Sequence, residues 1–172
     1  MEPRVLYPAH AGMTIECLTL TQPWASLMAA EIKRFETRMW KTAYRGPLGI
    51  HAAKTIPGWV LNWYRATPIA QACLRPLGVF EAADLLRMPK GEILAVVDLL
   101  DVETTDAGPD PGATERALGD WSPGRYAWKT GGLRLVKPAF ARSGAYSLWK
   151  WTVPEGVVIG EPRHGALTRA PV

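Results

Sequence analysis

The run GEILAVVDLLDV at residues 91–102 constrains the fold of this chain more than any other segment. Its apolar residues are almost uninterrupted, which is typical of a strand that is covered on both faces or lies in a barrel wall. Asp98 is the exception, and a carboxylate among valines and leucines must be paired or functional, because burying it alone is costly. Arg38 or Lys33 is its expected partner. The run therefore predicts a central strand of a packed sheet.

Further strands are predicted on both sides of this run. Alternating or branched apolar residues mark strands at residues 14–20, 35–40, 48–53 and 146–153. Residues 125–137 predict a hairpin, since Gly131 and Gly132 supply the positive φ of a tight turn. Strands therefore dominate the pattern.

Two helices are predicted between the early strands, because Pro23 and Pro57 each stand where a first helical residue is expected. The packing stripe of the second helix is expected to be Trp59, Val60, Trp63 and Tyr64. Pro68 ends that helix, and residues 69–74 add another short one. The polar stretch 103–124 predicts a long loop with one helical turn at residues 114–118.

These segments predict an α+β fold, a small mixed β-barrel with flanking helices. The expected domain occupies residues 14–153. A loosely held lead-in at residues 1–13 precedes it, and a surface tail at residues 154–172 follows it. Neither of these end segments shows hydrophobic periodicity.

Composition limits the classes of function that the chain can have. A length of 172 residues favours one domain, and the formal net charge of +4 is compatible with a polyanionic partner. Two cysteines and three histidines, without metal-site spacing, predict no metal site and no cofactor. The absence of an apolar run of roughly 18 residues, or of an apolar N-terminal segment, predicts a cytoplasmic protein without membrane contact. We also expect a monomer.

Ionisable residues gather between the predicted strands at residues 14–20 and 48–53. As a strand, residues 35–40 place Glu36 and Arg38 on one face, with Lys33 at the preceding junction. Such a cluster could perform acid–base chemistry, or hold phosphate with Glu36 orienting Arg38. The alternative is an ion-pair ladder on the surface, worth under ~1 kcal/mol. Arg45, His51 and Lys54 are expected at the outer rim of the same cleft.

Tryptophan is unusually frequent, with eight Trp against three Phe. Its ring N–H needs a partner when buried, so Trp is a poor filler of a small core. It is well suited to stacking on bases or lining a ligand cleft. For any one Trp, a place between the sheet and the helices remains the alternative.

Several motifs resemble those of the ASCH (activating signal cointegrator homology) domain family, which is similar to PUA domains. The motifs are QPWASL at residues 22–27, IKRFETR at residues 32–38, YRG at residues 44–46 and IHAAK at residues 50–54. The family pattern is Gly-x-Lys-x-x-Glu-x-Arg. Lys33, Glu36 and Arg38 match it in register, whereas Glu31 stands in place of the glycine. The resemblance covers roughly residues 15–153 and implies a PUA-like β-barrel with a helix-lined cleft.

The resemblance implies functions linked to RNA, DNA or modified nucleosides. Some small family members are amidohydrolases that act on acetylcytidine, using the motif lysine, a threonine and a distant glutamate. Glu36 stands where they have the threonine. Other members are ribonucleases. The longer type that carries QPWA is better known as a nucleic-acid-binding module, and this chain resembles that type most.

Nucleic-acid binding is therefore the function that we favour from the sequence, with RNA and DNA both open. The cations expected at phosphate are Lys33, Arg38, Arg45, Lys54 and Arg125, with His51 beside them. The residues expected to stack on a base or line the rim are Trp24, Trp40 and Tyr126. The alternatives are a nucleoside hydrolase or ribonuclease that uses Lys33 and Glu36 as catalytic residues, and a module for protein or small-ligand binding.

Overall fold

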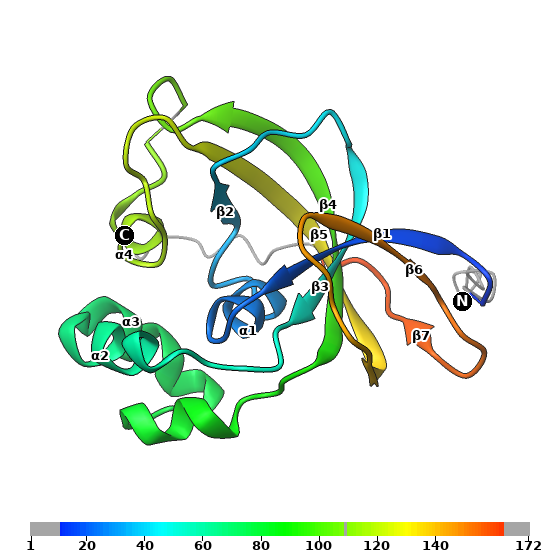
Figure 1. Ribbon diagram of the computed structural model, residues 1–172, viewed down its shortest axis with the longest axis horizontal. Helices are drawn as coiled ribbons and strands as arrows, with labels where there is room; N and C mark the ends of the chain where they lie inside the picture. Colours follow the sequence, from blue (N-terminus) through cyan, green and yellow to red (C-terminus); the bar gives the residue numbers. More distant parts are fainter. Residues whose placement is uncertain (1–10, 109, 164–172) are drawn as a thin grey trace, which may run out of the picture.

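A computed structural model describes residues 11–108 and 110–163 of the chain. Most of the predicted lead-in, residues 1–10, lies outside the described residues, as does the second half of the predicted tail, residues 164–172. The described part is an α+β structure with a mixed sheet and several helices (Figure 1).

Seven strands form the sheet. Their bounds are β1 Thr14–Leu20, β2 Phe35–Arg38, β3 Gly46–Ala52, β4 Glu92–Thr104, β5 Tyr126–Ala141, β6 Leu148–Thr152 and β7 Val158–Ile159. The order across the sheet is β2-β5-β4-β3-β1-β6, and β7 pairs with β5. β1 and β3 run parallel, while the other pairs are antiparallel. The nearly continuous apolar run predicted as a central strand is β4, in the middle of this order.

Four α-helices accompany the sheet in the described residues. Their bounds are α1 Trp24–Ala29, α2 Gly58–Ala66, α3 Pro68–Leu74 and α4 Ala113–Ala117. Two 3₁₀ turns, Arg75–Leu77 and Ala82–Arg87, lie between α3 and β4. In Figure 1, α2 and α3 lie side by side at the left, below α4, and α1 lies between them and the sheet. Because α1 packs its buried Met28 on β3 and β4, one core joins helix and sheet.

The predicted barrel is wrong, because the sheet is open. Closing a barrel requires the two edge strands to pair, and the edges here are β2, with four residues, and β6, with five. A side chain links β2 to β1 instead: Arg38 Nη2 donates to the Thr19 carbonyl at 2.9 Å. This side chain, and not backbone pairing, therefore links β2 to the end of β1, and residues of the candidate site lie around the link.

The predicted hairpin at residues 125–137 is also wrong, since these residues belong to the single strand β5. Gly132 has a φ of 60°, but it serves a bulge: β5 carries an extra residue where its register against β4 shifts. A Cβ at Gly132 would lie 2.4 Å from the Asp98 carboxylate. That carboxylate pairs with both terminal nitrogens of Arg134, at 3.1 and 2.8 Å. Arg134, rather than Arg38 or Lys33, is thus the partner of Asp98.

Two segments near the C-terminus differ from the predictions. Val157 and Ile159, in the expected surface tail, are buried against β1 and β6 residues that include Trp151. Tyr146, predicted near the centre of the last strand, precedes β6 and is 99% exposed.

Candidate functional site

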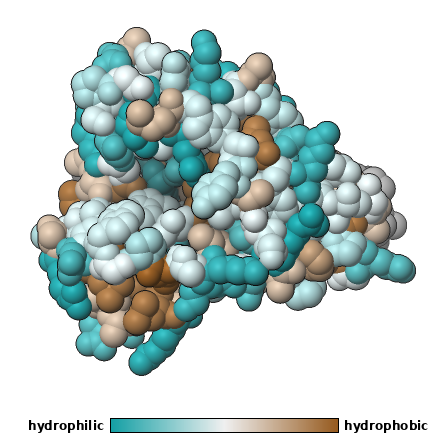
Figure 2. All heavy atoms as spheres, viewed as in Figure 1, coloured by the Kyte–Doolittle hydropathy of each residue, from teal (hydrophilic) through white to brown (hydrophobic). Residues whose placement is uncertain are grey.

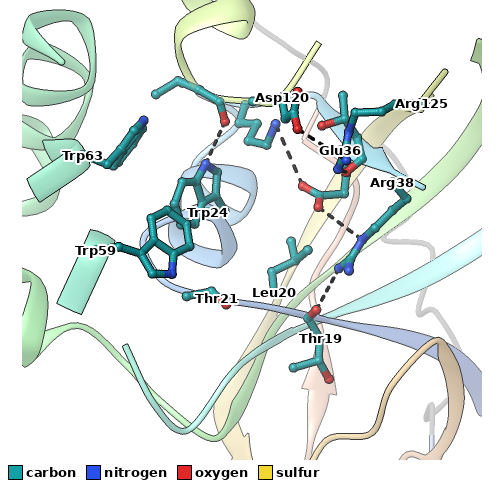
Figure 3. A pocket seen from close by; sticks show the side chains of 14 residues that line it. Thr19, Leu20, Thr21, Trp24, Glu36, Arg38, Trp59, Trp63, Asp120 and Arg125 are labelled. Carbon is teal, nitrogen blue, oxygen red and sulfur yellow. Dashed lines mark hydrogen bonds and ion pairs between the residues drawn. The ribbon is translucent and has the colours of Figure 1, made fainter. Parts of the chain in front are cut away.

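A cleft of about 560 Å³ opens between the ends of β1 and β2, the helix α2 and the loop after α4. Figure 2 shows the surface hollowed between the lobe with α2 and α3 and the lobe with α4. In Figure 3, three tryptophans stand on one side of the cleft, and charged residues that include Glu36 and Arg38 face them. The cleft therefore has an aromatic wall and a charged wall.

The aromatic wall consists of Trp24, Trp59 and Trp63. The Trp24 ring centroid lies 5.6 Å from that of Trp59 and 4.8 Å from that of Trp63. Trp24 Nε1 donates to the Leu118 carbonyl at 2.7 Å, which ties α1 to the end of α4. Trp59 is 58% exposed, so a flat aromatic face is open to solvent beside the cleft.

Lys33 lies at the base of the charged wall and is 1% exposed. Its Nζ is 3.9 Å from a carboxylate oxygen of Glu36 and 3.9 Å from one of Glu115. These distances are too long for hydrogen bonds, and Nζ has no hydrogen-bond partner among the described residues. Gly119 makes room for the ammonium, since a Cβ there would lie 3.3 Å from Nζ. A buried ammonium with free N–H donors thus lines the cleft.

Glu36 and Arg38 project from β2 on the same face, as the alternation of residues 35–40 predicts. Arg38 Nε lies 3.3 Å from Glu36 Oε1, and the other Glu36 oxygen is the one that approaches Lys33. The hydrogen bond from Arg38 to the Thr19 carbonyl fixes the far end of the guanidinium. Glu36 therefore lies between two cations and forms an ion pair with each.

Arg125 and Asp120 complete the charged wall. Arg125 Nη1 lies 3.4 Å from Asp120 Oδ2, and Arg125 Nη2 donates to the Thr37 carbonyl at 3.1 Å. The hydroxyl and backbone N–H of Ser122 donate to Asp120 and lower the pKa of its carboxyl, with a smaller contribution from the charge of Arg125. Asp120 is therefore a carboxylate at neutral pH, and it offers acceptor oxygens at the cleft.

Glu115, on α4, is the acidic partner that the sequence did not reveal. Its carboxylate accepts from the backbone N–H of Arg34, which holds the loop of residues 105–124 against the start of β2. Burial raises the pKa of the Glu115 carboxyl, while the Lys33 ammonium opposes this rise. The loop was predicted only as a polar connection with one helical turn, so no spacing connected Glu115 with Lys33.

The cleft brings together five of the residues predicted for the site. These are Trp24, Lys33, Glu36, Arg38 and Arg125. Four further residues have no predicted site role. Trp59, Trp63 and Asp120 line the cleft, and Glu115 lies beside Lys33. The i, i+4 spacing of Trp59 and Trp63 predicts both rings on one packing face of the helix. Trp63 packs against the helical core as well as lining the cleft, whereas Trp59 is largely exposed.

The other predicted residues lie elsewhere. Trp40 packs edge-on against the buried Trp128 at 4.7 Å, and Tyr126 packs on the same core. Arg45 Nη2 lies 3.3 Å from Asp101 at the surface. None of these three is among the described residues that line the cleft.

His51 and Lys54 line a neighbouring hollow instead of the cleft itself. His51 is 1% exposed and bonded through both ring nitrogens, so it belongs to the interior. Lys54 is exposed, and its Nζ donates to Ser143 Oγ at 2.9 Å. The two hollows share Arg38.

Two broader properties apply to residues 11–108 and 110–163. Over these ranges, every helix is too short or too polar to cross a bilayer. The same ranges contain no group of three or more His, Cys, Asp and Glu side chains placed to hold a metal ion.

Glu31 occupies the position that the resemblance assigns to glycine, and its φ of 58° is left-handed. A non-glycine residue in this conformation costs about 1–2 kcal/mol. We expect Glu31→Gly to raise the free energy of unfolding by up to about 1 kcal/mol, because glycine adopts this φ freely. Urea denaturation measures the change. Glu31→Ala is the control, since it removes the same carboxylate and keeps the strain; equal stability of the two variants would contradict the explanation.

The fold and the cleft define a class of protein: an α+β domain whose open sheet and helices enclose an amphipathic cleft. Residues 18–129 match the ASCH domain family, and the chain belongs to that family. It is also similar to Activating signal cointegrator 1 of Homo sapiens and of Mus musculus, with 38% identity over 85 residues in each case. The match covers 49% of this chain and 14% of each relative, so the chain spans a small part of their length.

Proposed function

We propose that this chain binds nucleic acid, RNA or DNA, by taking one unpaired base into the cleft. The observation that carries the proposal is the pairing of an exposed aromatic face at Trp59 with the buried Lys33 ammonium across the same cleft. Stacking on an aromatic ring suits any base, and N–H donors suit the ring nitrogens and carbonyl oxygens of a base edge. Membership of the ASCH family, whose longer type resembles nucleic-acid-binding modules, supports the same function.

The charge balance favours a base over a phosphate inside the cleft. Lys33, Arg38 and Arg125 each lie within 4 Å of a carboxylate, and the carboxylates of Glu36, Glu115 and Asp120 match them in number. A phosphate would meet these carboxylates as well as the cations. A base is neutral and presents both donors and acceptors, so it can use the ammonium and the carboxylates together.

We expect Trp59→Ala to weaken the binding of a single-stranded oligonucleotide by about 1–3 kcal/mol, or roughly 5- to 150-fold. The physical reason is the loss of one stacking face. Because Trp59 is largely exposed, the change should leave thermal stability nearly unaffected. Fluorescence polarisation with short labelled RNA and DNA, at two salt concentrations, measures the affinity and its salt dependence.

Phe80→Ala is the matched control, because Phe80 is 67% exposed and does not line the cleft. It should bind like wild type. If wild-type protein shows no binding at micromolar concentration in low salt, the proposal is wrong. Equal binding by Trp59→Ala and wild type would remove the aromatic wall from the interface.

Hydrolysis of a modified nucleoside or of RNA is the second candidate function. One observation favours it: the Lys33 ammonium lies beside two carboxylates, and burial raises the pKa of Glu115. A carboxyl with a raised pKa can exchange protons with a bound substrate, and the ammonium can donate hydrogen bonds to it. Acetylcytidine and unstructured RNA are the substrates to offer, with Glu115→Gln as the variant. Turnover that is unchanged in Glu115→Gln would exclude this carboxyl from the chemistry.

A further inference from the structure

A second hollow, of about 580 Å³, lies beside the cleft and shares Thr19, Thr21 and Arg38 with it. Its other side is the loop of residues 142–147, together with Lys54 after β3. Thr19 serves both hollows: its carbonyl accepts from Arg38, and its hydroxyl belongs to the network beneath the loop. The two hollows therefore adjoin at Thr19, Thr21 and Arg38.

The loop is held by a buried polar network. Trp149 Nε1 donates to Thr19 Oγ1 at 3.1 Å, Thr19 Oγ1 lies 3.1 Å from His51 Nδ1, and His51 Nε2 lies 2.8 Å from the Arg142 carbonyl. One donor order satisfies all three contacts: Thr19 donates to Nδ1, and Nε2–H donates to the carbonyl. This order needs a neutral imidazole, and burial lowers the pKa of His51. His51 is thus a support of the loop.

Gly144 lets the loop lie directly on this network. A Cβ at this position would lie 2.4 Å from Thr19 Oγ1 and 2.7 Å from two atoms of the His51 ring. Ser147, at the end of the loop, has a left-handed φ of 57°. The loop therefore has a defined shape, and the position of Tyr146 follows from it.

The second hollow differs from the cleft in its charge. The cleft is lined by Glu36 and Asp120, whereas the described residues that line the second hollow include no Asp or Glu. They do include the cations Arg38 and Lys54. The Ser143 hydroxyl, which accepts from Lys54 at 2.9 Å, adds a polar partner beside them. A phosphate fits this hollow, because ammonium, guanidinium and hydroxyl groups are its usual ligands.

Tyr146 adds an aromatic platform to the same hollow. Its side chain is 99% exposed, so no packing within the described chain accounts for an aromatic residue there. An exposed ring beside two cations is the combination found in sites for single-stranded nucleic acid, where bases stack on rings and cations follow the backbone.

We propose that the second hollow binds the phosphate and the base that adjoin the base held in the cleft. The ligand class is a single strand of RNA or DNA with at least two nucleotides. Arg38 and Lys54 contact the linking phosphate, and Tyr146 stacks on the second base. This inference rests on the proposed function of the cleft, and it makes the site longer than one nucleotide.

The test compares two ligands on the full chain. A labelled single-stranded octanucleotide of mixed sequence is titrated by fluorescence polarisation, and the four nucleoside 5′-monophosphates are titrated by calorimetry. Tyr146→Ala and Lys54→Ala should weaken octanucleotide binding about fivefold or more, and Lys54→Ala should reduce the salt slope by about one. Tyr146→Ala should bind each monophosphate within twofold of wild type, because a monophosphate has no second base. Phe80→Ala and Lys137→Ala, which alter an exposed aromatic and an exposed cation outside both hollows, should match wild type throughout.

The outcomes separate this inference from the proposed function. If wild type binds neither ligand, both are overturned. If wild type binds the octanucleotide, Trp59→Ala weakens it and the two variants of the second hollow do not, only the second hollow is excluded. A loss in Tyr146→Ala that is equally large for a monophosphate would also overturn it, because the hollow would then not serve a second nucleotide.

Discussion

Lys33→Met is expected to lower the free energy of unfolding by about 3–5 kcal/mol, the usual cost of removing one partner from a buried ion pair. Methionine has a similar length and fills the same space without a charge. The substitution removes the ammonium that lies 3.9 Å from the carboxylates of both Glu36 and Glu115, whose side chains are only 14% and 10% exposed. Their desolvation is then no longer offset by the ammonium.

The loss should depend on pH in a defined direction. Burial already raises the pKa of Glu115, and removing the Lys33 ammonium raises it further. A carboxyl with a raised pKa in the folded state binds protons more readily there than in the unfolded state. Its contribution to stability is therefore present at low pH and is lost as pH rises through the folded pKa. Lys33→Met should accordingly be closer to wild type at pH 5 than at pH 8.

Urea denaturation of wild type and variant at these two pH values measures the effect. Lys41→Met is the control, because Lys41 is an exposed lysine of the same segment and should change stability by less than about 0.5 kcal/mol. The double variant Lys33→Met with Glu115→Gln should recover part of the loss, since the charge of Glu115, whose ion-pair partner is Lys33, is gone while Glu36 keeps Arg38. A loss below about 1 kcal/mol, or the same loss at both pH values, would show that Lys33 does not compensate these carboxylates.

The sequence located the elements that follow local rules. The apolar run at residues 91–102 became β4, and the strand predicted at residues 14–20 has the same bounds as β1. The period-two alternation of residues 35–40 placed Glu36 and Arg38 on one face, and their charged groups lie 3.3 Å apart. Side-chain periodicity and proline geometry are local, so they can be recognised without a structure.

The contacts that could not be predicted depend on long-range packing. Glu115 reaches Lys33 across 82 positions, because α4 docks on the helical core through Leu118, and nothing in the polar loop indicates that docking. Asp98 finds Arg134 on the adjacent strand only because β5 continues through its two glycines with a bulge. The glycine pair supports a turn or a bulge equally well, and the register of the sheet decides between them.

The sequence pattern also did not predict which apolar side chains of α2 are exposed. Trp59 and Trp63 fit the apolar stripe of α2, but the buried positions of that stripe are Val60 and Tyr64. The tryptophans instead border the cleft between α2 and the ends of β1 and β2. Part of the packing face predicted for α2 therefore belongs to the aromatic wall of the candidate site.

Arg38→Ala is expected to have the largest effect on binding, because Arg38 is the charged residue that both hollows share. It removes a cation at the proposed phosphate position and leaves Glu36 beside Lys33 alone. The Thr19 carbonyl also loses its guanidinium donor. We expect octanucleotide affinity to fall by about 2–3 kcal/mol, or roughly 30- to 150-fold, as for other partly buried charge pairs at interfaces.

Arg38→Lys separates charge from geometry. A lysine restores the positive charge, but one ammonium on a flexible chain cannot hold Glu36 and the Thr19 carbonyl at the same time as a planar guanidinium does. Its affinity should therefore fall between those of Arg38→Ala and wild type. Arg45→Ala, which breaks a surface pair with Asp101 outside both hollows, should bind nearly as wild type does.

Comparing monophosphate and octanucleotide binding by the variants shows which hollow Arg38 serves. Because Arg38 borders the cleft as well as the second hollow, Arg38→Ala should weaken a nucleoside monophosphate and the octanucleotide alike, whereas Tyr146→Ala should weaken only the octanucleotide. If Arg38→Lys binds both ligands with wild-type affinity, positive charge alone matters and the fixed guanidinium does not position the strand. A binding defect confined to Arg38→Ala with the octanucleotide would place Arg38 in the second hollow alone and leave the cleft to Lys33 and the tryptophans.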